Sequence, residues 1–190
     1  MPGKTISNKS VIFLGGMTTY LRPLEVTDAP AMTRWINDEQ IRKYLTATKP
    51  LSETDEREWI VERSKDPTCV VLGIIQRAGT THIGNIGIHQ INQRNRTGVF
   101  GIMIGETATH KNGHGTEASN LLLKYAFETL NLRKIHSCVM EGNEPSIGLH
   151  KKLGFQEEGV REKEWFVEGE YVDEIQYALF CDQWLELQGK

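Results

Sequence analysis

The stretch IMIGETATHKNGHGTEASNLLLKYAF, residues 102–127, joins a strand, a glycine loop and a helix in that order. The apolar strand residues end near Gly105, and Gly113 and Gly115 lie in the loop that follows. Apolar side chains then recur with the spacing i, i+3, i+4, i+7 and i+8, which predicts an amphipathic helix over residues 116–130. These apolar positions are Ala118, Leu121, Leu122, Tyr125 and Ala126.

The glycine loop has the chemistry of an anion site. Glycines let the backbone turn sharply and place no Cβ between the main chain and a ligand. The free N–H groups in the first turn of a helix, at the positive end of its dipole, bind phosphate groups well. A Gly-x-Gly pair is also common in ordinary flexible loops between a strand and a helix. The loop by itself therefore leaves both interpretations open.

Turn and cap residues divide the rest of the chain into short elements. Ser52 and Asp55 are close to a capping box, and Gly154 suits the left-handed position after a helix. The expected helices are residues 28–35, 52–64, 116–130 and 145–153. The expected strands are a short pair within residues 11–24, then 69–76, 81–91, 97–105, 134–140, 159–167 and 171–180.

This order of elements predicts one α+β domain over residues 1–190. We expect a mixed, mostly antiparallel sheet of six to seven strands, flanked by about four helices. The long helix must carry the chain across one parallel step, from the strand at 97–105 to the strand at 134–140.

The composition limits the partners of the chain. It has 190 residues, with 25 acidic and 22 basic side chains and a net charge of −3. Nucleic-acid binders usually show a clustered basic stripe, so we expect no nucleic-acid partner. The run VIFLGGM at 11–17 is too short to span a bilayer, and residues 1–10 lack the apolar part of a signal peptide. Cys69, Cys138 and Cys181 form no disulfide or metal pattern. We therefore expect a cytoplasmic protein without a membrane partner.

Several blocks of the sequence resemble one family. The loop HKNGHG (110–115) resembles the pyrophosphate-binding loop of the GNAT acetyltransferases, with His110 where Gln or Arg is usual. Four further blocks are similar to the RimJ/RimL-like branch of this family. They are YLRPLEVTDAPAMTRWIND (20–38), GTEASNLLLKYAFETLNLRKI (115–135), NEPSIGLHKKLGFQEEG (143–159) and VEGEYVDEIQYAL (167–179). The resemblance covers roughly residues 19–181.

This resemblance implies a GNAT fold that binds acetyl-CoA in a V-shaped cleft between two splayed central strands. It implies transfer of the acetyl group to a primary amine by direct attack on the thioester. A main-chain N–H within residues 102–104 would donate to the thioester oxygen as charge develops, an interaction worth about 2.7–4 kcal/mol. The implied acetyl-CoA-binding residues are Ile102, Met103, Ile104, His110, Lys111, Asn112, Gly113, His114, Gly115, Thr116, Asn143 and Ser146.

His150 stands where many members of the family carry a Tyr that protonates the departing thiolate. An imidazole, with an unperturbed pKa of ~6.5, can perform the same step. In the alternative, His150 faces solvent at the rim of the pocket and water protonates the thiolate. Glu106, His89 and Glu141 are candidates for the general base, each with a solvated surface role as the alternative. His110 and His114 lack a zinc motif around them, so we predict no metal site.

The acceptor is defined less sharply. The family resemblance leaves open a protein N-terminus or a small-molecule amine such as an amino sugar or a polyamine. Deprotonating a lysine-like amine at pH 7 costs about 4.6 kcal/mol, against about 1.4 kcal/mol for an α-amino group of pKa ~8. Because no strong base stands out, weakly basic amines are favoured. Trp35, Trp59 and Trp165 could wall an acceptor site or belong to the core.

Two further alternatives remain open at this stage. The absence of the usual Tyr is compatible with a catalytically degenerate module that binds or senses acetyl-CoA without turnover. Assembly of the chain as a homodimer is likewise left open by the sequence.

Overall fold

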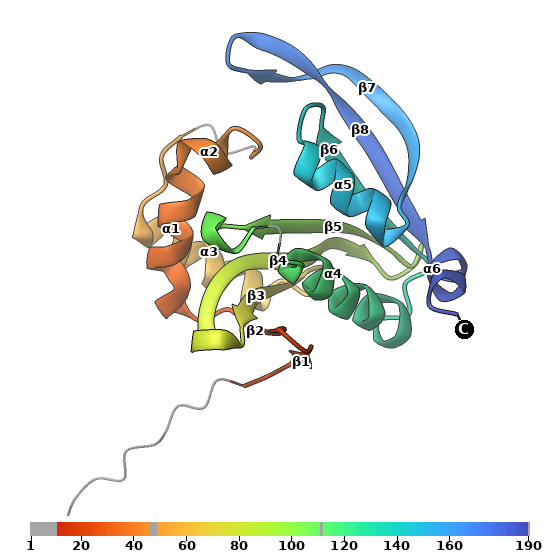
Figure 1. Cartoon of the computed structure of the whole chain (residues 1–190), viewed down its shortest axis with the longest axis horizontal. Coiled ribbons are helices and arrows are strands. Elements are labelled where there is room, and N and C mark those ends of the chain that lie inside the picture. Colours follow the sequence, from red (N-terminus) through yellow and green to blue (C-terminus); the bar gives the residue numbers. More distant parts are fainter. Residues whose placement is uncertain (1–10, 46–48, 111, 190) are drawn as a thin grey trace, which may run out of the picture.

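One eight-stranded sheet runs through the computed structural model, which describes residues 11–45, 49–110 and 112–189 (Figure 1). Its strand order is β1-β2-β3-β4-β5-β6-β8-β7. The strands are β1 (Leu14–Gly15), β2 (Thr19–Pro23), β3 (Val70–Gln76), β4 (Thr81–Asn92), β5 (Thr97–Ile104), β6 (Lys134–Met140), β7 (Gln156–Val167) and β8 (Glu170–Phe180). Every neighbouring pair is antiparallel except β5 and β6, which are parallel.

This topology confirms the predicted α+β class and the single parallel step. The sheet exceeds the expected six to seven strands because the two-residue β1 pairs with β2 at its edge. The α-helices of the described residues are α1 (Ala29–Asn37), α2 (Glu39–Arg42), α3 (Glu53–Lys65), α4 (His114–Lys124), α5 (Glu144–Leu153) and α6 (Cys181–Leu187). Single 3₁₀ turns lie at Val26–Asp28, Ala78–Thr80 and Thr107–Thr109.

The cap signals explain where two of these helices begin or end. Ser52 and Asp55 form the reciprocal capping box of α3, as predicted. Gly154 ends α5 with a φ of 86°, a conformation that an L side chain rarely adopts. The helices α2 and α6 were not predicted, because they have only four and seven residues and so carry little periodic signal.

Apolar clusters fill both faces of the sheet. The larger one joins Phe100 of β5 to Leu122 and other residues of α4. The smaller one contains Met32 and Trp35 of α1 and Ile60 of α3, with Met103 of β5 packed against it. Since alternate residues of a strand point to opposite faces, β5 presents one side to α4 and the other to α1 and α3. The strand at the centre of the sheet therefore contacts both layers of helices.

Figure 1 shows α5 beside β6 and the long β7–β8 hairpin extending beyond the other strands. Among the described residues, no helix is long and apolar enough to cross a membrane.

Candidate active site

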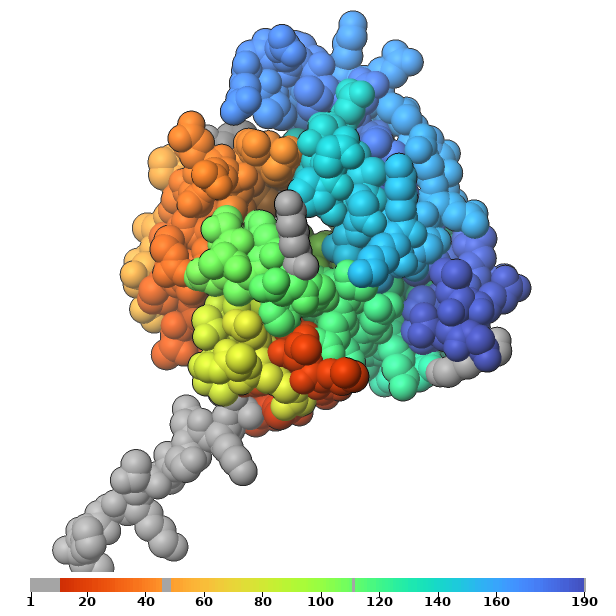
Figure 2. All heavy atoms as spheres, in the orientation of Figure 1, coloured from red at the N-terminus to blue at the C-terminus, as the bar shows by residue number. Residues whose placement is uncertain are grey.

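The strands β5 and β6 form a fork at the centre of the sheet. They pair at three positions, Thr97 with Lys134, Gly98 with Ile135 and Val99 with His136. Beyond this point the strands continue unpaired with each other, β5 to Ile104 and β6 to Met140. Figure 2 shows the molecule hollowed between the green segment that leads into α4 and the cyan segment that contains α5.

At the vertex of this fork, where the pairing of β5 with β6 ends, a side chain connects the two strands. The Oγ of Ser137, the first residue of β6 after the paired positions, lies 3.1 Å from the carbonyl oxygen of Phe100 on β5. The same Oγ lies 2.8 Å from Nε2 of His150 on α5. Ser137 was not among the predicted site residues, because a small polar side chain in a strand gives no signal of a long-range contact.

His150 is buried beneath the vertex rather than at the rim of a pocket. Its exposed fraction is 2%, and its ring stacks on Tyr177 at a centroid distance of 5.1 Å. This burial shows that the solvent-facing alternative for His150 is wrong. Burial lowers the pKa of His150, and the hydrogen bond to the Ser146 carbonyl, 2.7 Å from Nδ1, offsets only part of this effect. The acid role predicted for His150 would therefore have to pass through Ser137, the group on its other nitrogen.

The glycine loop leads directly into the first turn of α4. Gly113 takes a φ of 82° at the N-cap of the helix. The intrahelical bonds begin with the N–H of Glu117, 3.0 Å from the Gly113 carbonyl. The N–H groups of His114, Gly115 and Thr116 precede that bond and have no acceptor within the helix. This is the arrangement in which a helix start accepts an anion.

The surroundings of the loop have room for an extended ligand. A Cβ at Gly115 would lie 3.7 Å from Cγ1 of Ile104, so the start of α4 packs against the end of β5. A depression of about 820 Å³ continues from the loop along the exposed side of α4. Its lining includes Asn112, Gly113, Thr116, Asn120 and Lys152.

The side chains of two histidines of the loop make contacts away from the helix start. The side chain of His114 is buried, with its ring nitrogens 3.4 Å from Thr18 Oγ1 and from Gln76 Nε2. Only the main chain of His114 can therefore serve the anion site. His110 donates from Nε2 to the Ile104 carbonyl at 3.1 Å, which holds its ring at the end of β5. Lys111, also predicted at this site, lies outside the described residues.

Hydrogen bonds to Glu117 connect the start of α4 with the turn between β1 and β2. Its Oε2 accepts from the Thr19 N–H at 2.9 Å and from the hydroxyls of Thr18 and Thr19 at 2.5 Å. Burial alone would raise the pKa of Glu117, but these hydrogen bonds lower it from 4.5 to about 2. Glu117 was not among the predicted residues, although an acidic side chain in a first helical turn is a recognised signal.

The two predicted acetyl-CoA-binding residues at the start of α5, Asn143 and Ser146, are hydrogen-bonded to each other. The Oδ1 of Asn143 accepts from the Ser146 N–H at 3.3 Å and caps the helix. The amide N–H₂ group of Asn143 and the hydroxyl of Ser146 are the parts of these side chains that remain for a ligand.

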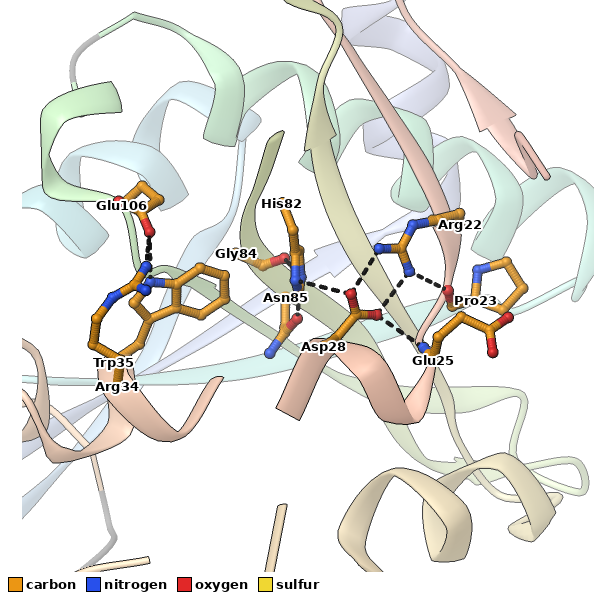
Figure 3. Close-up of polar contacts among 10 residues, drawn as sticks. All are labelled: Arg22, Pro23, Glu25, Asp28, Arg34, Trp35, His82, Gly84, Asn85 and Glu106. Atoms are coloured by element: carbon orange, nitrogen blue, oxygen red, sulfur yellow. Dashed lines mark hydrogen bonds and ion pairs between the residues drawn. The ribbon is translucent and has the colours of Figure 1, made fainter. Parts of the chain in front are cut away.

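The candidate bases lie at different ends of the fork. Glu106 is separated from the end of β5 by Gly105, and its Oε1 accepts from Trp35 Nε1 at 3.1 Å and from the guanidinium of Arg34 (Figure 3). His89 pairs with Val99 at the vertex, roughly 20 Å along the strand from Glu106. Burial and the guanidinium of Arg63 lower the pKa of His89. Glu141 is exposed after β6. The structure thus separates Glu106 from His89, and one amine cannot contact both.

Of the three tryptophans considered for the acceptor site, two lie in the core and one lies on the β7–β8 hairpin. Trp35 and Trp59 belong to the apolar cluster between α1 and α3. Trp165 on β7 donates from Nε1 to Oε2 of Glu174 at 2.9 Å. Glu174 lies on β8, opposite Met140 of β6.

The comparison with known families agrees with this geometry. Residues 19–156 match the Acetyltransferase (GNAT) domain family. The chain belongs to the GNAT acetyltransferases. This GNAT enzyme transfers an acetyl group from acetyl-CoA, its co-substrate, to an amine.

Individual relatives extend the match over most of the chain. "Putative ribosomal N-acetyltransferase YdaF" of Bacillus subtilis (strain 168) is 32% identical, over 86% of this chain and 92% of its own. The spermidine N(1)-acetyltransferase of Escherichia coli (strain K12) is 28% identical, over 87% of both chains. The structure of spermidine N-acetyltransferase from Vibrio cholerae in complex with CoA and spermine superimposes with a TM-score of 0.82. It is 26% identical and covers 88% of this chain and 98% of its own.

Proposed function

We propose that this GNAT enzyme acetylates a weakly basic primary amine, such as a protein N-terminus. The observation that carries this proposal is that two carboxylates, one beyond the end of β5 and one opposite the end of β6, are each paired with an arginine. Glu106, after β5, is paired with Arg34. Glu174, opposite Met140 at the end of β6, is 2% exposed and accepts from Arg161 Nη1 at 3.1 Å.

These ion pairs bear on the charge of the acceptor. A polyamine carries several ammonium groups and gains affinity from carboxylates that have no other cation beside them. Because Arg34 and Arg161 already compensate Glu106 and Glu174, these two carboxylates offer little extra attraction for a second ammonium group. An α-amine also needs only about 1.4 kcal/mol for deprotonation at pH 7, so that one modest base is enough.

The acetyl-CoA site follows from the glycine loop and the fork. The N–H groups of His114, Gly115 and Thr116, which have no acceptor within the helix, suit the pyrophosphate. The part of β5 at 102–104, which pairs with β4 but not with β6, suits the acetyl-bearing end of acetyl-CoA. The amide of Asn143 and the hydroxyl of Ser146 would contact the same arm from α5. Together these groups would hold the thioester between the two arms of the fork.

The chemical step then needs two proton transfers. The amine nitrogen attacks the thioester carbon, and Glu106 accepts the proton that the nitrogen loses. The C–S bond breaks with its electron pair on sulfur. The thiolate takes the Ser137 hydroxyl proton, which is replaced from Nε2 of a protonated His150. Each proton therefore has a named donor and acceptor within this chain.

A panel of acceptors tests the proposed substrate class. Release of free thiol from acetyl-CoA would be measured at pH 7.5 with a peptide bearing a free N-terminus, the same peptide blocked at its N-terminus, an amino sugar and spermidine. We expect the free peptide to show kcat/KM at least about tenfold above spermidine, and the blocked peptide to show none.

The relatives named as spermidine acetyltransferases make a polyamine the second candidate. A higher kcat/KM for spermidine than for the free peptide would establish that candidate and overturn the proposal. Binding of acetyl-CoA without thiol release by any of these amines would place the acceptor outside all the classes named.

A further inference from the structure

Trp35 contacts Glu106 at the mouth of the fork. The indole Nε1–H donates to Oε1 of Glu106 at 3.1 Å, and the Arg34 guanidinium approaches the same oxygen. Figure 3 shows both α1 side chains pointing toward the Glu106 carboxylate. The Arg34 side chain is 63% exposed, so the indole is the more rigidly held of the two donors.

The indole has no freedom to move. Trp35 is 2% exposed and packs with Met32 and Ile60. A Cβ at Gly105 would lie only 2.0 Å from Cδ2 of Trp35, so the ring fills the space that a side chain at position 105 would take. The residue directly before Glu106 thus has to be glycine for the indole to sit where it does.

The indole of Trp35 also packs against a second ring, which is itself held by polar contacts. His82 meets Trp35 edge to face, with ring centroids 4.9 Å apart. Nε2 of His82 lies 2.9 Å from both the Gly84 carbonyl and Oδ1 of Asn85. Nδ1 lies 3.4 Å from Asp28, which Arg22 holds through two contacts of 2.7 Å (Figure 3). A buried polar network therefore supports the ring that supports Trp35.

Glu106 is fixed at its main chain as well. The N–H groups of Gly105 and Glu106 both donate to the Ile83 carbonyl, at 2.8 and 3.2 Å. One carboxylate oxygen, Oε1, is occupied by Trp35 and Arg34. Within the described part of the chain, Oε2 receives no hydrogen bond. A carboxylate held by one oxygen with the other free has the geometry of a general base.

We propose that Trp35 is a positioning residue that holds Glu106 so that its free oxygen faces the acceptor amine. The proposal rests on the general-base role of Glu106 proposed above. Because Trp35 is 2% exposed, it offers almost no surface to the acetyl donor or the amine, and its effect on the reaction would pass through Glu106. This distinguishes Trp35 from an ordinary core residue, whose loss would act on the whole fold.

A double-mutant cycle tests this dependence. The variants are Trp35→Phe, Glu106→Gln and the two combined, with kcat measured by thiol release on the fastest amine of the panel. Trp35→Phe keeps an aromatic ring and removes the N–H. We expect Glu106→Gln to lower kcat about 100-fold. Trp35→Phe should lower it about tenfold in the wild-type background and leave it unchanged in the Glu106→Gln background.

Two controls separate positioning from folding. Trp59→Phe changes a tryptophan of the same apolar cluster and should leave kcat within about twofold. Arg34→Gln removes the second hydrogen-bond donor to Glu106, at an exposed position outside the core. It should lower kcat in the wild-type background and leave it unchanged in the Glu106→Gln background. The melting temperature and the KM for acetyl-CoA, measured for every variant, show how much of each loss of kcat comes from the fold or from binding of the acetyl donor, and the KM should be the same for Trp35→Phe and Trp59→Phe.

The outcomes are distinguishable. An equal loss of kcat on Trp35→Phe in both backgrounds, or no loss at all, overturns the positioning role and leaves Glu106 as the base. An unchanged kcat in Glu106→Gln overturns the base assignment, and the positioning role is lost with it. Neither result affects the proposed class of acceptor, which the panel decides separately.

Discussion

Ser137 and His150 meet at the vertex of the fork, where Oγ of Ser137 lies 2.8 Å from Nε2 of His150. The carbonyl of Ser146 can only accept, so Nδ1 of His150 carries a proton. In the neutral ring Nε2 is then an acceptor, and the Ser137 hydroxyl donates to it. In the imidazolium Nε2 donates to Ser137, whose own proton becomes free for Phe100 or for a ligand in the fork.

This relationship makes the acid role of His150 testable by pH. Burial lowers the pKa of His150 below 6.5, so the donating imidazolium is already the minor form at pH 6.5 and becomes scarcer as the pH rises further. If His150 supplies the thiolate proton, its contribution decreases toward alkaline pH. We expect the ratio of kcat between the wild type and His150→Gln to be larger at pH 6 than at pH 8.

The ratio would be measured with a saturating amine and acetyl-CoA, so that binding does not enter. Ser137→Ala should show the same dependence on pH, because it interrupts the same path. A ratio that stays constant from pH 6 to pH 8 would mean that water protonates the thiolate.

Local signals in the sequence predicted much of the fold, but not the contact between Ser137 and His150 at the vertex of the fork. The capping box of Ser52 and Asp55 and the left-handed Gly154 depend only on their near neighbours, and both were confirmed. The contact between Ser137 and His150 depends on how α5 packs against β6, which no spacing along the chain encodes. For the same reason the family resemblance identified the position of His150 but not its burial.

The pairing of Glu117 with the β1–β2 turn predicts a loss of stability in acid. Hydrogen bonds from Thr18 and Thr19 hold the pKa of Glu117 at about 2, below its ordinary value of 4.5. Since the folded state favours the ionised carboxylate, its contribution is complete above pH 4.5. It disappears progressively as the pH falls from 4.5 toward 2.

Glu117→Gln removes this contribution at every pH. We expect its melting temperature to lie below that of the wild type at pH 7, with the difference narrowing as the pH falls from 5 to 3. Glu62→Gln, at an exposed position of α3, serves as the control and should follow the wild type. A difference that does not change over this range would contradict the assigned ionisation.

Gly113 predicts an effect on acetyl-CoA rather than on the fold. Its φ of 82° strains any L residue, but among the described residues no atom lies within 4 Å of a Cβ built there. Gly113→Ala should therefore cost about 1 kcal/mol of stability. It should also weaken acetyl-CoA binding, because the new methyl group lies beside the free N–H groups of α4.

Gly169 provides the matched control. It has a φ of 93° and is equally open, but it lies in the turn between β7 and β8. Gly169→Ala should lose similar stability and keep the dissociation constant of acetyl-CoA, measured by calorimetry. Equal affinity in both variants would count against the anion site at the start of α4.

Gly101 in β5 and Gly105 just after it lie four residues apart and face the same side of the sheet. We expect a methyl group to have different effects on stability at the two positions. At Gly105 a Cβ would meet Trp35 at 2.0 Å, and the buried indole has no space to retreat. At Gly101 the nearest atom, Nε2 of His89, is 3.7 Å away, an ordinary contact. Gly105→Ala should therefore lower the free energy of unfolding by about 1–3 kcal/mol in a urea titration, because overpacking displaces the indole. Gly101→Ala should change it far less, since the methyl group is accommodated. Equal losses in the two variants would show that backbone entropy, rather than contact with Trp35, governs this side of β5.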